Sequence, residues 1–249
     1  MKKLEGKVAV VTGASKGIGA EIARAFGREG AEVVVNYATS KEGADRVVAE
    51  IVKGGGRAVA VQADVSKSAD VTRLFAETKR AYDRLDVLVN NAAVFKFDPL
   101  EAVTEDELQR ELATNLIGPV LAAKEALGLF GERGGSIINI GTVATQLRMP
   151  GSLVYVASKS ALEAVTRVLS SELGARRIRV NTLSPGGVET EGYQALGEAG
   201  DQMKAAFVPR TPLGRFGRVD DIAKVAVFLA SDDAAWITGE NLAASGGFN

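Results

Sequence analysis

The sequence predicts an α/β fold in which helices cover both faces of a parallel, doubly wound sheet. Two observations lead to it. Short β-branched runs alternate along the chain with longer stretches whose apolar residues recur at helical spacing. Several of the short runs are apolar almost throughout, as expected of strands that are covered on both faces. Repeated strand–helix–strand units of this kind build a parallel sheet.

The elements follow one another without a linker or a repeat. The predicted strands cover residues 8–11, 32–36, 58–62, 87–90, 136–140 and 179–182, and the predicted helices cover residues 17–29, 42–53, 69–82 and 152–173. Residues 186–213 break this rhythm with several glycines and prolines, and we expect a substrate lid there. A disordered surface insertion is the alternative interpretation of that segment.

Length and composition fit one soluble α/β domain over residues 1–249, with 46% hydrophobic and 24% charged residues. The 30 basic and 31 acidic residues are scattered, so nucleic acid is not an expected partner. The N-terminus lacks the apolar region of a signal peptide, and no apolar run is long enough to cross a membrane. We therefore expect a cytoplasmic protein without a membrane partner.

The chain contains neither histidine nor cysteine. This composition excludes disulfides, thiolate nucleophiles, Ser-His-Asp triads and metal sites built on these ligands. We expect no metal, and acid–base chemistry must use other side chains.

A glycine-rich turn, Thr12-Gly13-Ala14-Ser15-Lys16-Gly17-Ile18-Gly19, follows the first predicted strand and precedes a helix. Glycines here let the backbone approach a pyrophosphate at the helix N-terminus, where unpaired N–H groups favour an anion. A simple turn is the alternative. We expect a dinucleotide cofactor in contact with Gly13, Ser15, Lys16, Gly17, Ile18 and Gly19.

The end of the second strand bears on the choice of cofactor. Asn36 and Tyr37 stand where NAD-binding proteins carry a carboxylate for the ribose. Lys16, with Ser40 and Lys41 nearby, can bind a 2′-phosphate through charge-assisted bonds. NADP is therefore expected in preference to NAD, and Asn36→Asp should shift the preference towards NAD. Ordinary solvated lysines are the alternative.

Polar residues also follow the third and fourth strands. Asp64 and Val65 follow the third, and Asn90-Asn91-Ala92-Ala93 follows the fourth. Open α/β sheets bind ligands at this edge, so Asp64, Val65, Asn91 and Ala92 are candidate cofactor contacts. Such residues can hold the adenine or brace the loop after the first strand, and Asn90 can serve a purely structural role.

Tyr155 and Lys159 lie four residues apart in a predicted helix and so share one face. A nearby ammonium favours the phenolate, so Lys159 is expected to lower the pKa of Tyr155 from its ordinary value near 10. By itself this spacing also fits a surface pair.

The glycine-rich turn, Asn90-Asn91-Ala92-Ala93, Asn115, the Tyr155 and Lys159 pair, and Ser184-Pro185-Gly186 occur in this order along the chain. Together they resemble the short-chain dehydrogenase/reductase family over about residues 6–247. The resemblance extends to 3-oxoacyl-acyl carrier protein reductases, carbonyl reductases and glucose dehydrogenase-like members. It implies a Rossmann-type sheet of about seven parallel strands, the last at residues 240–244, and a homotetramer built through the helix that carries Tyr155.

The resemblance also implies residue roles. Tyr155 would donate a proton to a substrate carbonyl while hydride passes from the nicotinamide, and Lys159 would also bind the nicotinamide ribose. Asn115 would hold a water in a proton relay to Lys159. The segment after the sixth strand would close over the nicotinamide through Pro185, Gly186, Val188 and Thr190.

One position departs from the family pattern. Thr142 stands where the family usually has a serine that orients the substrate carbonyl. Threonine keeps the hydroxyl but adds a methyl group, so we expect activity to be retained at a lowered level. By position, the side chains facing the substrate are expected to be Val94, Thr145, Leu147, Leu153 and Tyr193. They are mostly apolar, which favours a ketone or hydrophobic alcohol over a sugar.

The sequence thus predicts an NADP-dependent oxidoreductase that acts on a ketone or secondary alcohol, as a carbonyl or 3-oxoacyl reductase. The alternative is a catalytically weakened regulator that keeps the dinucleotide site, and Thr142 is the feature that supports it.

Overall fold

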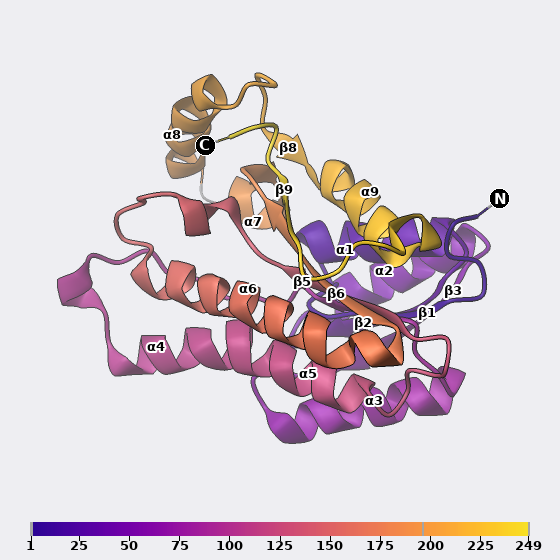
Figure 1. Ribbon diagram of the computed structural model, residues 1–249. Helices are drawn as coiled ribbons and strands as arrows, with labels where there is room; N and C mark the ends of the chain where they lie inside the picture. Colours follow the sequence, from indigo (N-terminus) through magenta and orange to yellow (C-terminus); the bar gives the residue numbers. More distant parts are fainter. Residues whose placement is uncertain (1, 196, 249) are drawn as a thin grey trace.

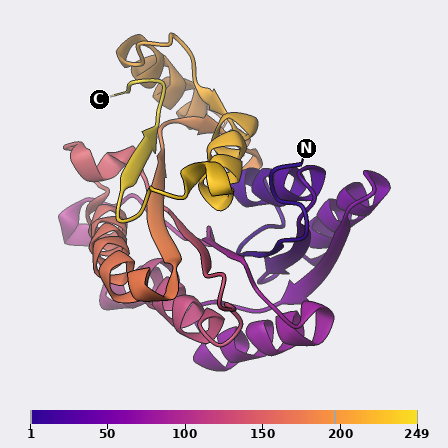
Figure 2. The same cartoon turned by 45° about the vertical axis from the view of Figure 1, so that its right-hand side comes forward.

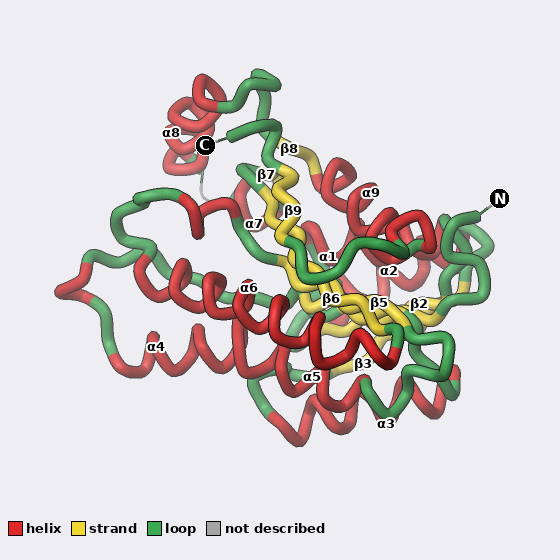
Figure 3. Tube along the Cα trace, viewed as in Figure 1, coloured by secondary structure: helices red, strands yellow, loops and turns green. Residues whose placement is uncertain are grey.

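A computed structural model describes residues 2–195 and 197–248. Its centre is a parallel seven-stranded sheet in the order β3-β2-β1-β4-β5-β6-β9 (Figures 1 and 3). The strands are β1 (Val8–Val11), β2 (Glu32–Tyr37), β3 (Arg57–Gln62), β4 (Val87–Asn90), β5 (Gly135–Ile140), β6 (Ile178–Pro185) and β9 (Asn241–Ala244). The predicted fold class is confirmed.

The strand order reverses between β1 and β4, which are hydrogen-bonded neighbours. From β1 the chain proceeds outwards through β2 to β3, then returns to β4 and proceeds outwards on the other side. Loops after β1 and β4 therefore leave the sheet in opposite directions, and a crevice opens between them at the carboxyl ends of the strands.

Helices cover both faces of the sheet (Figures 1 and 2). One layer contains α1 (Gly17–Arg28), α2 (Lys41–Lys53) and α9 (Val219–Ala230), and the other contains α3 (Ser68–Tyr82), α4 (Glu105–Leu112), α5 (Gly118–Ala126) and α6 (Leu153–Leu173). Because side chains alternate along a strand, Ala9 and Val11 pack into the first core, and Val8 and Val10 into the second. Both faces of β1 are therefore buried.

A π-helical turn, Ala113–Ile117, joins α4 to α5. Such turns are rare and recur at functional sites. No helix was predicted over residues 105–126 or 219–230, where the structure has α4, α5 and α9.

Residues 186–213 contain regular elements that the sequence analysis did not predict. They include β7 (Val188–Glu189), α7 (Glu191–Gln194) and α8 (Glu198–Phe207). β7 pairs with β8 (Gly217–Arg218) in a separate two-stranded sheet. Phe207 stacks on Phe248 with ring centroids 4.4 Å apart, so the segment packs against the end of the chain. Leu196, within the expected lid, lies outside the described residues.

Within the described part of the chain, no helix is both long and apolar enough to cross a membrane.

Candidate active site

A cleft of about 900 Å³ opens at the carboxyl ends of the strands, from the glycine-rich turn to Phe216. Most of the predicted site residues line it: Gly13, Ser15, Lys16, Gly17, Ile18, Gly19, Asn36, Asp64, Val65, Asn91, Ala92, Val94, Thr142, Leu147, Tyr155, Lys159, Pro185, Gly186, Val188, Thr190 and Tyr193. The fold thus brings together residues that are far apart in the sequence.

The glycine-rich turn is shaped by backbone that other residues rarely adopt. Gly13 and Gly17 have φ angles of 62° and 59°, in the left-handed region. A Cβ at Gly19 would collide with the side-chain amide of Asn91. Asn91 Nδ2 donates to the carbonyls of Thr12 (2.8 Å) and Gly13 (3.1 Å). The side chain of Asn91 therefore braces the loop after β1. This is one of the two roles that the sequence suggested for polar residues at this edge of the sheet.

The N-terminus of α1 opens into the cleft. Its N-cap residue, Lys16, gives no side-chain hydrogen bond to the first turn. The backbone N–H of Gly17 donates to Glu191 Oε2 at 2.8 Å, so a carboxylate from α7 already uses this anion-favouring end. A helix N-terminus of this kind, behind a glycine cradle that a Cβ would fill, fits the pyrophosphate of a dinucleotide.

The end of β2 differs from expectation. Tyr37 is buried in the core and Ser40 caps α2 by accepting from Gly43 N, so neither lines the cleft, whereas Ala38 and Thr39 do. The strand extends through Tyr37, and alternation along it turns that side chain into the core.

Asn36 is fixed by its neighbours. Its Oδ1 accepts from Gly13 N at 3.1 Å, and its Nδ2 donates to the carbonyls of Ala63 (3.0 Å) and Val61 (3.2 Å). This buried amide joins the glycine-rich turn to the end of β3. The side chain at position 36 therefore both accepts and donates hydrogen bonds. A carboxylate could accept from Gly13 N but could not donate to the two carbonyls.

Lys159 is 2% exposed, and its Nζ donates to the carbonyl of Ile140 at 2.8 Å. Burial lowers the pKa of Lys159 to about 8, and the charge of Glu111 opposes the shift. Burial raises the pKa of Tyr155, a hydrogen bond to Thr142 opposes this, and Glu111 raises it further. Burial is the largest cause of this shift, and Lys159 is not among its causes. The expected lowering of the Tyr155 pKa by Lys159 is therefore not found.

Thr142 lies at the end of β5, beside Tyr155. Its hydroxyl accepts from Ala144 N at 3.2 Å and lies close enough to the Tyr155 phenol to lower the pKa of that group. The extra methyl group of threonine therefore leaves the hydroxyl next to the phenol.

Asn115 lies in the π-helical turn and is fully buried. Its Oδ1 accepts from Val94 N at 2.9 Å, and its Nδ2 donates to Val94 O at 2.8 Å and to Ser158 Oγ at 3.1 Å. It does not line the cleft, and its amide connects the segment after β4 to α6.

Two of the expected substrate-facing residues lie elsewhere. The Thr145 hydroxyl contacts Glu163 Oε1 at 2.7 Å, and Leu153 is exposed at the start of α6; neither lines the cleft. Residues that the sequence analysis missed do line it, namely Phe95, Phe97, Met149, Met203, Phe207 and Phe216. The alternation of Phe95 and Phe97 after a strand end was the available signal for the first two.

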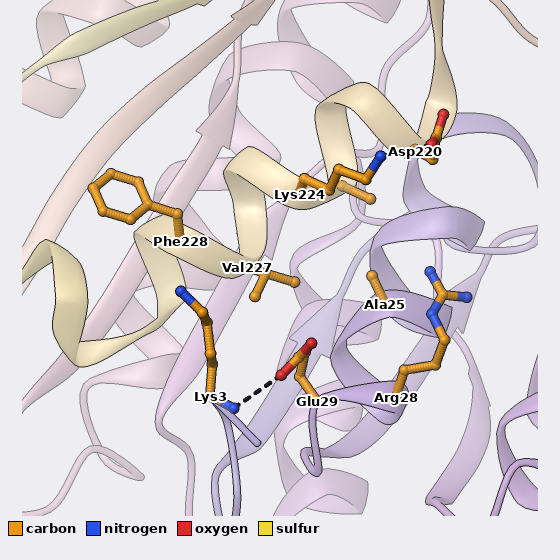
Figure 4. A pocket seen from close by; sticks show the side chains of 9 residues that line it. Lys3, Ala25, Arg28, Glu29, Asp220, Lys224, Val227 and Phe228 are labelled. Atoms are coloured by element: carbon orange, nitrogen blue, oxygen red, sulfur yellow. Dashed lines mark hydrogen bonds and ion pairs between the residues drawn. The ribbon is translucent and has the colours of Figure 1, made fainter. Parts of the chain in front are cut away.

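A second, smaller cavity of about 360 Å³ lies between α1 and α9 (Figure 4). Its charges are mixed: Lys224 Nζ donates to Asp220 at 2.9 Å, and Glu29 Oε2 accepts from the main-chain N–H of Lys3 at 2.9 Å. It contains none of the predicted site residues. No cluster of acidic residues suited to a metal ion occurs among the residues that the structure describes.

Comparisons with known proteins agree with this geometry. Residues 13–249 match the family model described as enoyl-(acyl carrier protein) reductase. An uncharacterized oxidoreductase of Methylorubrum extorquens is 56% identical over 247 residues, covering 99% of each chain. The tetrahydroxynaphthalene reductase of Pyricularia oryzae is 38% identical, covering 98% of this chain and 90% of its own. The structure of the angucycline C-6 ketoreductase LanV with bound NADP is 38% identical with a TM-score of 0.92, covering 99% of this chain and 96% of its own.

Fold and site together define an oxidoreductase that uses a nicotinamide cofactor and acts on a small molecule. The extent of these matches shows that the chain belongs to the short-chain dehydrogenase/reductase family.

Proposed function

We propose that the protein is an NADPH-dependent reductase of ketones carried on aromatic ring systems. The observation that carries the proposal is an aromatic cluster around Tyr155. The ring centroids of Phe95 and Phe97 lie 5.8 Å and 6.4 Å from that of Tyr155, at interplanar angles of 61° and 82°. Both phenylalanines are exposed, at 54% and 44%, and line the cleft. Exposed rings beside the proton donor suit a flat aromatic substrate.

The chemistry follows from the chain's own groups. The Thr142 and Tyr155 hydroxyls orient a carbonyl oxygen between them, and Tyr155 passes its proton to that oxygen as charge develops. Lys159 places a positive charge behind Tyr155, which stabilises the phenolate left after transfer. The glycine-rich turn and residues 185–190 would hold a reduced nicotinamide cofactor, which would provide the hydride for the carbonyl carbon. The product is a secondary alcohol, and the reverse steps oxidise it.

The preference for NADP rests on Lys16 and on the uncharged residues after β2. Lys16, Ala38 and Thr39 all line the cleft, and Asn36 adds no negative charge to it. A 2′-phosphate at this position would meet a cation and no carboxylate from β2. NADP is also the cofactor named for the LanV structure.

A relative supports the aromatic substrate class. The name tetrahydroxynaphthalene reductase denotes a fused aromatic ring system, which is the shape that the rings of Phe95 and Phe97 suit. A 3-oxoacyl thioester, the other substrate class considered, would make no use of these two rings.

The test compares 1-tetralone with its saturated counterpart, 1-decalone, by following NADPH absorbance. We expect kcat/KM to favour 1-tetralone, and Phe95→Leu to reduce that preference about fivefold. Tyr155→Phe should abolish turnover of both ketones. Equal kcat/KM values in the wild type would contradict the aromatic preference. NADPH binding without turnover of any ketone would favour the regulator instead.

We also propose that residues 186–213 act as a lid and that the protein is a homotetramer. Gly186, Val188, Thr190 and Tyr193 all line the cleft, as residues of a closing segment would. Ile117, Val120 and Val168 leave apolar side chains exposed along α5, α6 and the turn before them. Protection of residues 186–213 from hydrogen exchange by NADPH tests the lid, and sedimentation velocity tests the tetramer.

A further inference from the structure

Glu111, in the last turn of α4, is a buried carboxylate that the chemistry above does not use. Its side chain has no exposed surface. Oε1 accepts a hydrogen bond from the backbone N–H of Lys96 at 2.6 Å. Oε2 is buried and receives no N–H or hydroxyl donor among the described residues, and the neighbouring acidic group is the Glu107 carboxyl, which raises the pKa of Glu111. A buried carboxyl group next to a second one is costly to ionise, so this position calls for an explanation.

Its first contact positions the aromatic cluster. Glu111 and Asn115 lie one helical turn apart, and both bind the backbone of the segment after β4. Asn115 holds Val94 through its N–H and its carbonyl, and Glu111 holds the N–H of Lys96. Phe95 lies between these two anchors. The side chains of α4 and the π-helical turn therefore fix where its ring meets Tyr155.

A neutral glutamine would provide the same acceptor for Lys96 N without burying a charge. The tether therefore does not explain why the residue is an acid. Because a buried charge is costly, the negative charge of Glu111 needs a function of its own.

Glu111 acts electrostatically on both groups of the acid–base pair. Burial lowers the pKa of Lys159, and the Glu111 charge raises it. Burial raises the pKa of Tyr155, and the same charge raises it further. A negative charge here therefore favours the ammonium of Lys159 and the protonated phenol of Tyr155, the forms that carbonyl reduction needs.

The groups around Glu111 set its own protonation. Burial raises the pKa of Glu111 to about 7, and the Lys96 N–H opposes this shift. On the same helix Glu107 raises the pKa of Glu111 and Arg110 lowers it. From α6, Lys159 and Tyr155 are the titratable groups on which it acts.

We propose that Glu111 is a positioning residue for the reduction, holding Phe95 beside Tyr155 and maintaining the positive charge on Lys159. The proposal rests on the function proposed above. It assigns the acid–base pair a third ionisable partner, on a different helix.

Glu111→Gln separates the charge from the tether. Glutamine keeps an acceptor for Lys96 N but removes the negative charge. Because that charge raises the pKa of Lys159, its loss should move the alkaline limb of the kcat–pH profile for reduction to lower pH, by about one unit. Glu105→Gln makes the same change on the exposed face of α4 and should leave the profile in place. An unmoved limb in folded Glu111→Gln overturns the electrostatic role.

Glu111→Leu removes the tether as well. We expect KM for 1-tetralone to rise about tenfold above that of Glu111→Gln, because the loss of one buried hydrogen bond frees the Phe95 segment. Thermal melts confirm that both variants fold. Equal KM values in the two folded variants would overturn the positioning of Phe95.

A readout without turnover keeps the proposal separate from the proposed function. Infrared difference spectra of wild type against Glu111→Gln isolate the protonated carboxyl band of Glu111 as pH is varied. Its midpoint is expected near the pKa of about 7. A carboxyl band that persists above pH 9 would contradict the electrostatic role, because Glu111 would then be uncharged while Lys159, with its pKa of about 8, loses its proton. If no ketone is reduced, the proposed function fails, and this titration still decides whether Glu111 ionises as inferred.

Discussion

Lys159 Nζ donates a hydrogen bond to the carbonyl of Ile140, 2.8 Å away at the end of β5. The bond ties α6 to the centre of the sheet and holds a buried ammonium at the end of β5. Burial lowers the pKa of Lys159 to about 8, so the folded state gives up this proton more readily than the unfolded chain does.

Replacing this ammonium should therefore trade activity for stability. Lys159→Met should abolish reduction and raise the free energy of unfolding at pH 7 by about 1–3 kcal/mol, because it removes a buried charge. In the wild type the penalty is complete below pH 8 and fades as pH rises towards 10.5, where the unfolded chain also loses the proton. Urea unfolding at several pH values should thus show the advantage of Lys159→Met shrinking from pH 8 upwards. A constant difference would contradict the pKa of about 8.

Thr142 should support catalysis as serine would. Thr142→Ser keeps the hydroxyl next to Tyr155 and should leave kcat within about threefold of the wild type, whereas Thr142→Ala should lower kcat about 100-fold. Thr142 also lowers the pKa of Tyr155, so in Thr142→Ala the acidic limb for alcohol oxidation, below which the phenol keeps its proton, should move to higher pH. Steady-state rates in both directions provide the measurement. Equal kcat in Thr142→Ala and the wild type would show that the hydroxyl takes no part.

Lys16 should distinguish the two cofactors. Lys16→Ala removes the cation that lines the cleft and should weaken NADPH binding about tenfold, with little effect on NADH. Lys41→Ala is the matched control, because Lys41 pairs with Asp45 at 2.6 Å and does not line the cleft. Fluorescence titration of each cofactor gives the dissociation constants. Parallel losses for NADPH and NADH would argue against a 2′-phosphate site at Lys16.

Asn36→Asp should cost stability rather than simply switch the cofactor. The new carboxylate would face the carbonyls of Ala63 and Val61, to which Asn36 Nδ2 now donates. We expect a loss of about 2–4 kcal/mol in the free energy of unfolding, measured in urea. Thr39→Asp places a carboxylate at an exposed position that lines the cleft and should disfavour NADPH at little cost in stability. A fully stable Asn36→Asp would show that its hydrogen bonds are dispensable.

The parallel sheet could be predicted because its signals are local. Buried parallel strands are apolar throughout, and β1 and β4 are buried over their full lengths. Helix α1 buries a continuous apolar face that includes Ile22, Ala23 and Phe26. The helices α4 and α5 escaped prediction, because α4 is polar over most of its length and a π-helical turn shifts the register before α5.

Side-chain direction at the end of β2 could not be predicted. One further residue in the strand sends Tyr37 into the core, and Ser40 caps α2 instead of meeting the cofactor. The sequence pattern does not fix the last residue of a strand, and successive side chains in a strand point to opposite faces of the sheet. The direction of the Tyr37 side chain therefore depended on where β2 ends.

The sequence by itself determined the family, the sheet, the glycine-rich turn and the position of Tyr155 and Lys159 on one helical face. These depend on spacing within one element or on motifs in a fixed order. The tertiary structure decided which groups from distant segments meet: Glu191 at the N-terminus of α1, Phe95 against Tyr155, and Glu111 within electrostatic reach of Lys159. Burial and charge are properties of packed surroundings, and a pKa is set by every element that packs around the group.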